Sequence, residues 1–164
     1  GCIAVSLAYY IENSVITAID ISEMALKTAK LNAEANNVAD RITFVHSNLF
    51  KDIPNEHPDR MYDIIVSNPP YIPTEDIKHL QKEVRCFDPI AALDGGQDGL
   101  EFYRAIIDGV NDFLKPGGLL ALEVGFGQAD DVAALMNGKF EDIRKKKDLS
   151  GTERVVLGHR KTIL

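Results

Sequence analysis

Residues that build disulfide frameworks and metal sites are scarce in this sequence of 164 residues. It has two cysteines, Cys2 and Cys86, and four histidines that are scattered along the chain. Two cysteines are too few for a disulfide framework, and no group of Cys and His residues has the spacing of metal ligands, so we expect no metal site. No apolar run approaches the roughly 20 residues that cross a bilayer, and no secretory leader is evident. We therefore expect a cytoplasmic protein that does not insert into a membrane.

Basic residues are outnumbered by acidic ones. The 18 Lys and Arg residues and the 25 Asp and Glu residues give a net charge of -7, and the pI is near 5.0. This balance argues against a protein that coats nucleic acid through electrostatics, so no direct nucleic-acid binding is expected. The basic run from Arg144 to Lys147 is interpreted as a solvated strand end and turn, with partner binding as the alternative. The apolar fraction of 45% and the charged fraction of 26% are typical of one ordinary globular domain.

Strand and helix patterns alternate along most of the chain. Apolar and β-branched runs predict strands at residues 15–20, 42–46, 64–67, 119–124, 140–146 and 153–158. Helical spacing of apolar residues predicts helices at residues 1–8, 22–35, 100–114 and 128–136. The alternation, with a pair of strands at the end, predicts an α/β fold: a doubly wound, mostly parallel sheet whose last strand is antiparallel.

The connections between these elements differ in length. Residues 51–60 form a polar connection, and residues 115–118 are expected to end the preceding helix. Residues 73–99 are too long for a simple connector and are expected to carry function. Within them, residues 94–99 are rich in glycine. A phosphate-binding loop would need a strand before it and a Lys-Ser/Thr pair after it, and both are missing, so we favour a turn.

The stretch around which the chain is organised runs from Ile64 to Tyr71. Its first half is a continuous apolar run and predicts a strand that is buried on both faces. Its second half, Asn68-Pro69-Pro70-Tyr71, cannot continue that strand, because each proline lacks an N–H group and has a fixed φ. The Asn68 amide oxygen and the nearby carbonyls form a rigid group of acceptors beside the Tyr71 ring, which suits a planar NH₂ group. The alternative is a proline-rich turn that only ends a core strand.

The second half of this stretch resembles the signature of methyltransferases that use S-adenosylmethionine to modify amino groups conjugated to a planar π-system. The resemblance implies that Asn68, Pro69, Pro70 and Tyr71 form the catalytic site, with S-adenosylmethionine as the cofactor. Enzymes of this kind act on the amines of adenine, cytosine or guanine, or on the side-chain amide of glutamine. The motif alone does not choose among these acceptors.

Further polar residues lie where neighbouring predicted strands end. Asp20 is placed to accept hydrogen bonds from both ribose hydroxyls of a nucleotide, with a helix-flanking acid as the alternative. Leu49 is expected to pack on the adenine ring and Asn48 to pair with its edge, although methyltransferases of this type more often carry Asp at this position. Because the carboxyl ends of the strands meet at one rim of such a sheet, we expect Asp20, Asn48 and Asn68 to lie together around the cofactor.

Longer motifs point to one family among these methyltransferases. Four stretches look like the HemK family, the release factor glutamine methyltransferases: residues 83–89, residues 92–100, residues 122–125 with Gln128 after them, and residues 148–158. The resemblance spans essentially the whole chain and implies methylation of the side-chain amide nitrogen of the glutamine in a Gly-Gly-Gln motif. The protein partner would then be a class I peptide chain release factor. The alternatives are an N6-adenine methyltransferase acting on DNA or RNA, and a non-catalytic peptide-binding module.

The resemblance also predicts that residues 1–164 form one methyltransferase catalytic domain that lacks parts of its family. Class I methyltransferases have a strand and a glycine-rich loop before the helix with which this chain begins, and Gly1 looks like the last glycine of that loop, at a cofactor-binding position. That strand normally lies between the strand ending at Asp20 and the strand preceding Asn68. We therefore expect a fragment without the first strand, the loop and the family's N-terminal helical domain, and we expect this fragment to bind the cofactor poorly.

Overall fold

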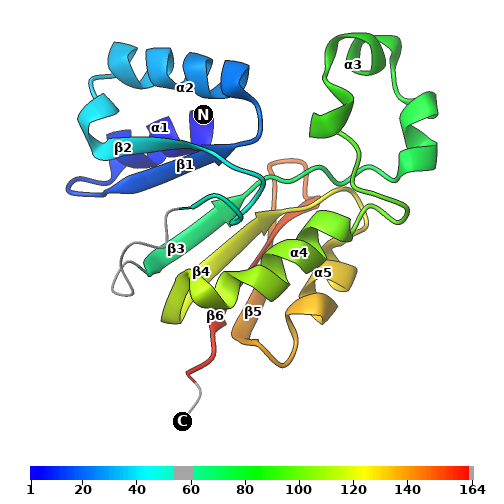
Figure 1. Ribbon diagram of the computed structural model, residues 1–164. Helices are drawn as coiled ribbons and strands as arrows, with labels where there is room; N and C mark the ends of the chain where they lie inside the picture. The colour runs from blue at the N-terminus through cyan, green and yellow to red at the C-terminus, as the bar shows by residue number, and fades with distance from the viewer. Residues whose placement is uncertain (54–60, 163–164) are drawn as a thin grey trace. The chain divides into compact units, whose positions relative to one another are not determined.

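The computed structural model describes residues 1–53 and 61–162, and the chain forms two compact units, Gly1–His57 and Pro58–Leu164 (Figure 1). Most of the polar connection expected at residues 51–60 lies outside the described residues. The first unit contains α1 (Cys2–Tyr10), β1 (Ile16–Asp20), α2 (Glu23–Ala35), η1 (Ala39–Arg41) and β2 (Ile42–His46), where η marks a 3₁₀ helix. None of the helices in the described ranges is long and apolar enough for a membrane span.

The first unit is a two-stranded parallel sheet covered by helices (Figure 1). β1 and β2 pair in a register that sets Asp20 opposite His46 at their carboxyl ends. Between them in the chain, Ser22 precedes α2, and its Oγ accepts a hydrogen bond from the Ala25 amide at 3.2 Å and so caps the helix. Small and branched apolar side chains fill the core of this unit: Val5, Ala8, Ala33, Val38 and Ile42.

The second unit is a four-stranded sheet with helices. Its strands are β3 (Tyr62–Ser67), β4 (Leu114–Glu123), β5 (Phe140–Lys147) and β6 (Glu153–Arg160), in the order β3-β4-β6-β5. β3 and β4 are parallel, and the last strand, β6, is antiparallel to both of its neighbours, as the sequence predicts. The helices are η2 (Thr74–His79), α3 (Lys82–Phe87), η3 (Ile90–Ala92), α4 (Glu101–Gly109), η4 (Val110–Asp112) and α5 (Ala129–Met136).

The core of the second unit lies between its sheet and its two longer helices, α4 and α5 (Figure 1). Buried side chains come from alternate positions of the strands and from one face of each helix: Tyr103, Ile106, Leu120, Leu122, Val124, Val132, Met136 and Val156. Burying one such aliphatic side chain stabilises the fold by about 1.5–3 kcal/mol. The helix predicted at residues 100–114 ends at Gly109 and continues only as the short η4.

The prediction that the strand beginning at Ile64 is buried on both faces is wrong. Ile64 and Val66 are 50% and 40% exposed. Ile65 pairs with Leu120, whose side chain is buried, so alternate residues of β3 point to opposite faces of the sheet. A continuous apolar run therefore hides an alternation of burial that its residue types do not reveal.

One other expectation needs correction. Residues 115–118 do not simply end a helix, because they lie within β4, where the register against β3 shifts between Tyr62 and Ile64. The described strands form two sheets, in which β1 pairs with β2 and β3 pairs with β4, and neither β1 nor β3 has a second partner strand among the described residues. This is the pairing expected when the strand that normally lies between β1 and β3 is missing. The absence of a first strand and glycine-rich loop remains a prediction.

Candidate active site

The Asn68–Tyr71 turn begins one residue after β3 ends. Asn68 is exposed, Pro69 is buried, and Pro70 and Tyr71 are half-buried, so the turn lies at the surface of the second unit with one proline anchored in it. Two successive prolines fix φ and cannot extend the ladder with β4. The chain therefore leaves the sheet at Asn68, as the sequence predicts.

A pocket of about 270 Å³ opens beside this turn. It is lined by Asn68, Pro69, Tyr71, Ile72, Ala92 and Leu93. Within the described part of the chain, neither the Asn68 side chain nor the Pro69 carbonyl has a hydrogen-bond partner. The pocket thus combines apolar walls with free acceptors, which suits a planar group that donates two N–H bonds.

Ala92 and Leu93 reach the pocket because the chain returns to the turn after its three short helices. The Ile72 amide donates to the Leu93 carbonyl at 3.0 Å, and the Gly95 amide donates to the Ile72 carbonyl at 2.8 Å. Asp94 holds this return in place, since its Oδ1 accepts bonds from the Thr74 hydroxyl at 2.7 Å and from the Gly96 amide at 3.0 Å. The glycine-rich residues 94–99 therefore form a turn, as predicted.

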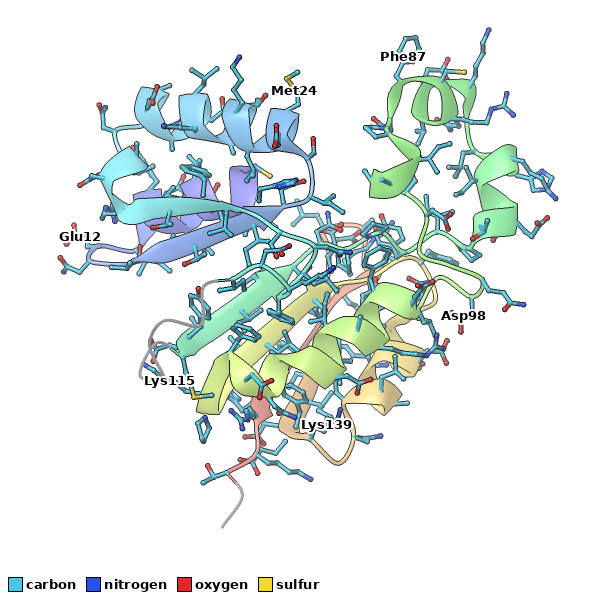
Figure 2. All side chains as sticks on the ribbon, in the orientation of Figure 1. Glu12, Met24, Phe87, Asp98, Lys115 and Lys139 are labelled. Atoms are coloured by element: carbon cyan, nitrogen blue, oxygen red, sulfur yellow. The ribbon has the colours of Figure 1, made fainter. Side chains whose placement is uncertain are left out.

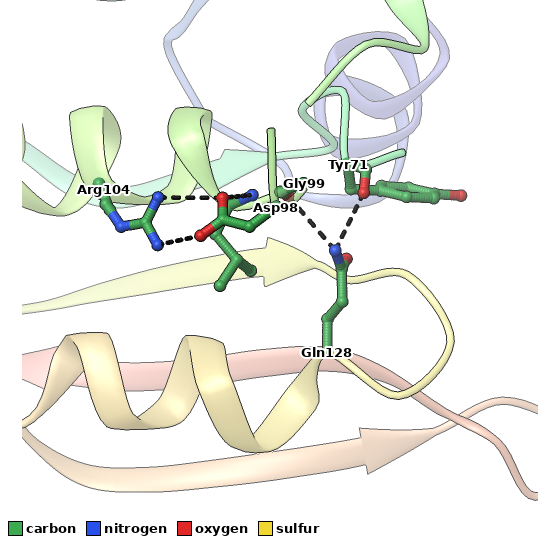
Figure 3. Close-up of polar contacts among 6 residues, drawn as sticks. Tyr71, Asp98, Gly99, Arg104 and Gln128 are labelled. Carbon is green, nitrogen blue, oxygen red and sulfur yellow. Dashed lines mark hydrogen bonds and ion pairs between the residues drawn. The ribbon is translucent and has the colours of Figure 1, made fainter. Parts of the chain in front are cut away.

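Tyr71 is held by the side chain of Gln128 and packs closely against glycine backbone. The Gln128 side chain donates from Nε2 to the Tyr71 carbonyl at 2.9 Å and to the Gly99 carbonyl at 3.3 Å (Figure 3). Its Oε1 accepts from the Gly125 amide at 3.0 Å. A Cβ on Gly125 would lie 2.9 Å from Cδ2 of the Tyr71 ring, so only glycine allows this approach.

A buried tyrosine, Tyr103, holds the end of the strand that precedes Gly125. Tyr103 of α4 donates from its hydroxyl to the Glu123 carbonyl at 2.9 Å, at the end of β4. Burial raises the pKa of the Tyr103 hydroxyl well above its ordinary value. The group therefore stays neutral at physiological pH and acts as a structural donor, not as a base.

In the first unit, the carboxyl ends of β1 and β2 carry the residues expected to hold a cofactor. Asp20 Oδ1 accepts a bond from the Ser22 amide at 2.8 Å, and the Asp20 carbonyl accepts from the Ser47 amide at 3.1 Å. The second carboxylate oxygen of Asp20 has no partner among the described residues. The aspartate thus combines a fixed orientation with a free acceptor.

The Ser47–Leu49 turn follows β2 directly. Ser47 is 2% exposed, and its hydroxyl donates to the Leu49 carbonyl at 2.8 Å and accepts from the Asp52 amide at 3.0 Å. These bonds hold Leu49 at a φ of 52°, a conformation that residues other than glycine seldom adopt. Asn48 is exposed, and its side chain is free of hydrogen bonds to the described residues.

Gly1 occupies the N-cap position of α1 and packs against α2. A Cβ on Gly1 would overlap the Cβ of Ala29, so a larger residue does not fit there without a shift. The close packing explains glycine at this position on steric grounds alone. Its role toward a cofactor remains a prediction.

The structure brings together the predicted residues of each group. Asp20, Asn48 and Leu49 lie at one end of the first unit's sheet. In the second unit, Asn68, Pro69 and Tyr71 line one pocket, whereas the half-buried Pro70 is not among its lining residues. The shared rim of the two groups remains a prediction. The sequence marked residues 92–100 and Gln128 as parts of family motifs but did not predict that Ala92 and Leu93 line this pocket or that the Gln128 amide binds Tyr71. The hydrogen bonds by which the Ser47 hydroxyl holds its turn were also not predicted.

Comparisons with known proteins agree with the motifs. The methyltransferase small domain family matches residues 1–84. The release factor glutamine methyltransferase of Geobacter sulfurreducens is 43% identical over 159 residues, which cover 96% of this chain and 54% of that protein. The chain thus spans about half the length of the curated relatives it matches. The resemblance to release factor glutamine methyltransferases is confirmed.

Solved structures agree on the fold. A methyltransferase from Pyrococcus furiosus superposes with a TM-score of 0.68 at 19% identity, covering 96% of this chain and 68% of that one. The release-factor-specific protein-(glutamine-N5) methyltransferase from Alicyclobacillus acidocaldarius gives a TM-score of 0.51 at 21% identity, covering 98% and 92%. These matches confirm the predicted class I methyltransferase fold. The family match over residues 1–84 shows that the chain belongs to the methyltransferase small domain family.

Proposed function

We propose that this chain is the catalytic part of an enzyme that methylates the side-chain amide nitrogen of a glutamine. The protein substrate would be a class I peptide chain release factor, methylated at its Gly-Gly-Gln motif. The pocket beside Asn68 carries this proposal, because it offers two free acceptors beside apolar walls. Relatives that are 37–43% identical over nearly the whole chain and are named release factor glutamine methyltransferases support the choice of substrate.

The residues of the first unit fit S-adenosylmethionine as the methyl donor. The free oxygen of Asp20 suits the ribose hydroxyls. The free amide of Asn48 and the apolar side chain of Leu49, whose backbone is held at a φ of 52°, suit the adenine. An amide at position 48 accepts a hydrogen bond from the adenine amine without the charge assistance of an aspartate. Gly1 would contribute as the end of the loop that the family places before α1.

An amide nitrogen is a poor nucleophile, because its lone pair is delocalised into the carbonyl. S-adenosylmethionine, when bound, supplies a methyl group on a positively charged sulfur that leaves with the bonding electron pair. Asn68 Oδ1 and the Pro69 carbonyl would accept the two N–H bonds of the substrate amide and direct its lone pair forward. Tyr71 would pack against the amide and the neighbouring glycines. Holding two reactants in line lowers the barrier by several kcal/mol, up to about 7–11.

No side chain of the pocket needs to act as a strong base. The nitrogen loses a proton only as the new N–C bond forms, when its acidity rises sharply. Asn68 Oδ1 would hold that proton until it passes to water. Burial keeps the nearby Tyr103 hydroxyl neutral by raising its pKa, so this group is not a competing base.

We place the reaction in the cytoplasm. We expect no direct binding of nucleic acid, in keeping with the net charge of -7. The experiment compares transfer of a radiolabelled methyl group by the full-length protein to a class I release factor, to DNA and to RNA. The proposal expects label in the release factor alone. Label in DNA or RNA would instead support the amino-methyltransferase alternative, and no transfer to any acceptor would support a non-catalytic binding module.

A further inference from the structure

Gln128 links three separate parts of the second unit. It follows β4 and directly precedes α5, and its backbone amide donates to the Gly125 carbonyl at 3.2 Å, which closes the turn between them. Its side chain joins this turn to Tyr71, 57 positions away, and to Gly99, 29 positions away (Figure 3). The half-buried amide therefore uses both N–H donors and its oxygen on main-chain groups.

The three contacts fix the orientation of this amide. In the opposite orientation, Oε1 would face the carbonyl oxygens of Tyr71 and Gly99, and Nε2 would face the Gly125 N–H group. Acceptors would then meet acceptors and a donor would meet a donor. The side chain thus fits its site in one way only, and its donated bonds are specific to an amide.

Gly99 and Gly125 pack closely against the side-chain amide of Gln128. A Cβ on Gly99 would lie 2.7 Å from Gln128 Nε2 and would overlap the Tyr71 carbonyl. A Cβ on Gly125 would lie 2.6 Å from Gln128 Oε1. The backbones of both glycines therefore lie against the glutamine amide, and the packing holds the Tyr71 carbonyl in one place.

The Gly99 side of this link has its own anchor. Asp98 accepts two bonds from Arg104, at 3.1 Å and 2.5 Å, and a third from the Leu100 amide at 3.1 Å (Figure 3). These bonds fix the turn that presents the Gly99 carbonyl at the start of α4. Gln128 thus connects Tyr71 to a turn that is itself held by hydrogen bonds from Arg104 and from the Leu100 amide.

We propose that Gln128 is a positioning residue for the Asn68–Tyr71 turn. By holding the Tyr71 carbonyl, it sets the direction of the free acceptors at Asn68 and Pro69 without contacting the substrate. The inference rests on the proposed function, since it assigns those acceptors to the substrate amide. A misplacement of reacting groups by about 1 Å lowers a rate by up to 100-fold. Loss of the Gln128 contacts is therefore expected to lower kcat.

Two substitutions in the full-length protein test this role. Gln128→Glu keeps the length and the acceptor for Gly125 but sets an oxygen against two carbonyls, whereas Gln128→Met keeps the bulk and removes every hydrogen bond. Gln97→Glu is the matched control, because Gln97 is exposed in the neighbouring turn. We expect kcat for a release factor to fall about 10- to 100-fold in both Gln128 variants, with cofactor affinity and the KM for the factor changed less than about twofold. The control should behave as wild type.

Hydrogen exchange supplies a readout that does not depend on activity. The Ile72 and Gly95 amides hold the turn against residues 90–95, and their exchange should quicken in Gln128→Met but not in the control. A variant that melts earlier but keeps wild-type kcat and wild-type exchange below its Tm would overturn the inference. If the wild-type protein methylates no release factor, the proposed function fails, and the exchange rates alone then decide for or against the positioning role.

Discussion

Gly95 packs directly against the main chain of Tyr71, so that a Cβ on Gly95 would lie 2.7 Å from the Tyr71 Cα. The φ of Gly95 is not positive, and its space is therefore limited by this contact and not by backbone conformation. The contact holds the return segment with Ala92 and Leu93 against the Asn68–Tyr71 turn. The part of the pocket lined by Ala92 and Leu93 thus depends on glycine at position 95.

Gly95→Ala should therefore damage the pocket. Because the added methyl group meets backbone atoms that cannot rotate away, we expect a loss of about 1–3 kcal/mol in the free energy of unfolding and a fall in kcat. Gly117→Ala in β4 is the matched control, since a Cβ there meets nothing within 4 Å and only its φ of 76° opposes alanine, at about 1–2 kcal/mol. Chemical denaturation and methyl-transfer assays measure both effects. Equal kcat in the Gly95 variant and the wild type would contradict the packing argument.

Asn68→Ala removes the side-chain acceptor of the pocket. We expect kcat to fall by about 100-fold or more, the usual effect of losing one preorganised hydrogen bond to a reacting group. Cofactor affinity, measured by calorimetry on the full-length protein, should change less, because Asp20 and Asn48 are intact. Asn137→Ala, at an exposed asparagine after α5, serves as the control. Unchanged turnover in Asn68→Ala would remove this residue from catalysis.

Ser47→Ala tests the turn that carries Asn48 and Leu49. Loss of the buried hydroxyl leaves the Asp52 amide and the Leu49 carbonyl without their partner, which costs about 1–3 kcal/mol in stability. Leu49 then loses the contact that holds its positive φ, so cofactor affinity should weaken. Ser6→Ala, at an exposed position of α1, is the control. Calorimetric titration that finds equal affinity in all three proteins would separate this turn from cofactor binding.

The Asp98–Arg104 pair predicts a pH dependence. The two bonds from Arg104, together with the Leu100 amide, lower the pKa of Asp98 from 3.8 to about 2. A carboxyl whose pKa is lower in the folded protein stabilises the fold above its unfolded pKa, and this contribution is lost as the pH falls through the folded value. The stability difference between wild type and Asp98→Asn should therefore be full above about pH 4 and shrink toward about pH 2. A difference that stays constant over this range would show that the pair does not act in solution.

The sequence predicts the regular elements well where one pattern dominates. The strand at residues 42–46 matches β2, and the helix at residues 22–35 differs from α2 by one residue, because Ser22 gives a clear capping signal. Residues 73–99 show no sustained apolar period, so their three short helices were not predicted. The exposure of Ile64 and Val66 was missed for a related reason, since residue type alone does not tell which face of a sheet is covered.

Some residues of the candidate site could likewise be predicted from the sequence, and others could not. Asn68 to Tyr71 were recognised because two prolines after an apolar run leave few structural options. Leu93 and Gln128 act through contacts across 21 and 57 positions, and the partners in such contacts cannot be identified from a local pattern in a single sequence. Their parts in the pocket follow only from the fold.

The most direct test of the central claim is to locate the methyl group on its acceptor. A class I release factor is incubated with the full-length protein and S-adenosylmethionine, digested, and analysed by tandem mass spectrometry, with Asn68→Ala in parallel. The account predicts one added methyl group on the side-chain nitrogen of the Gly-Gly-Gln glutamine with wild type, and almost none with the variant. A methyl group on any other residue, or equal modification by the two proteins, would contradict it.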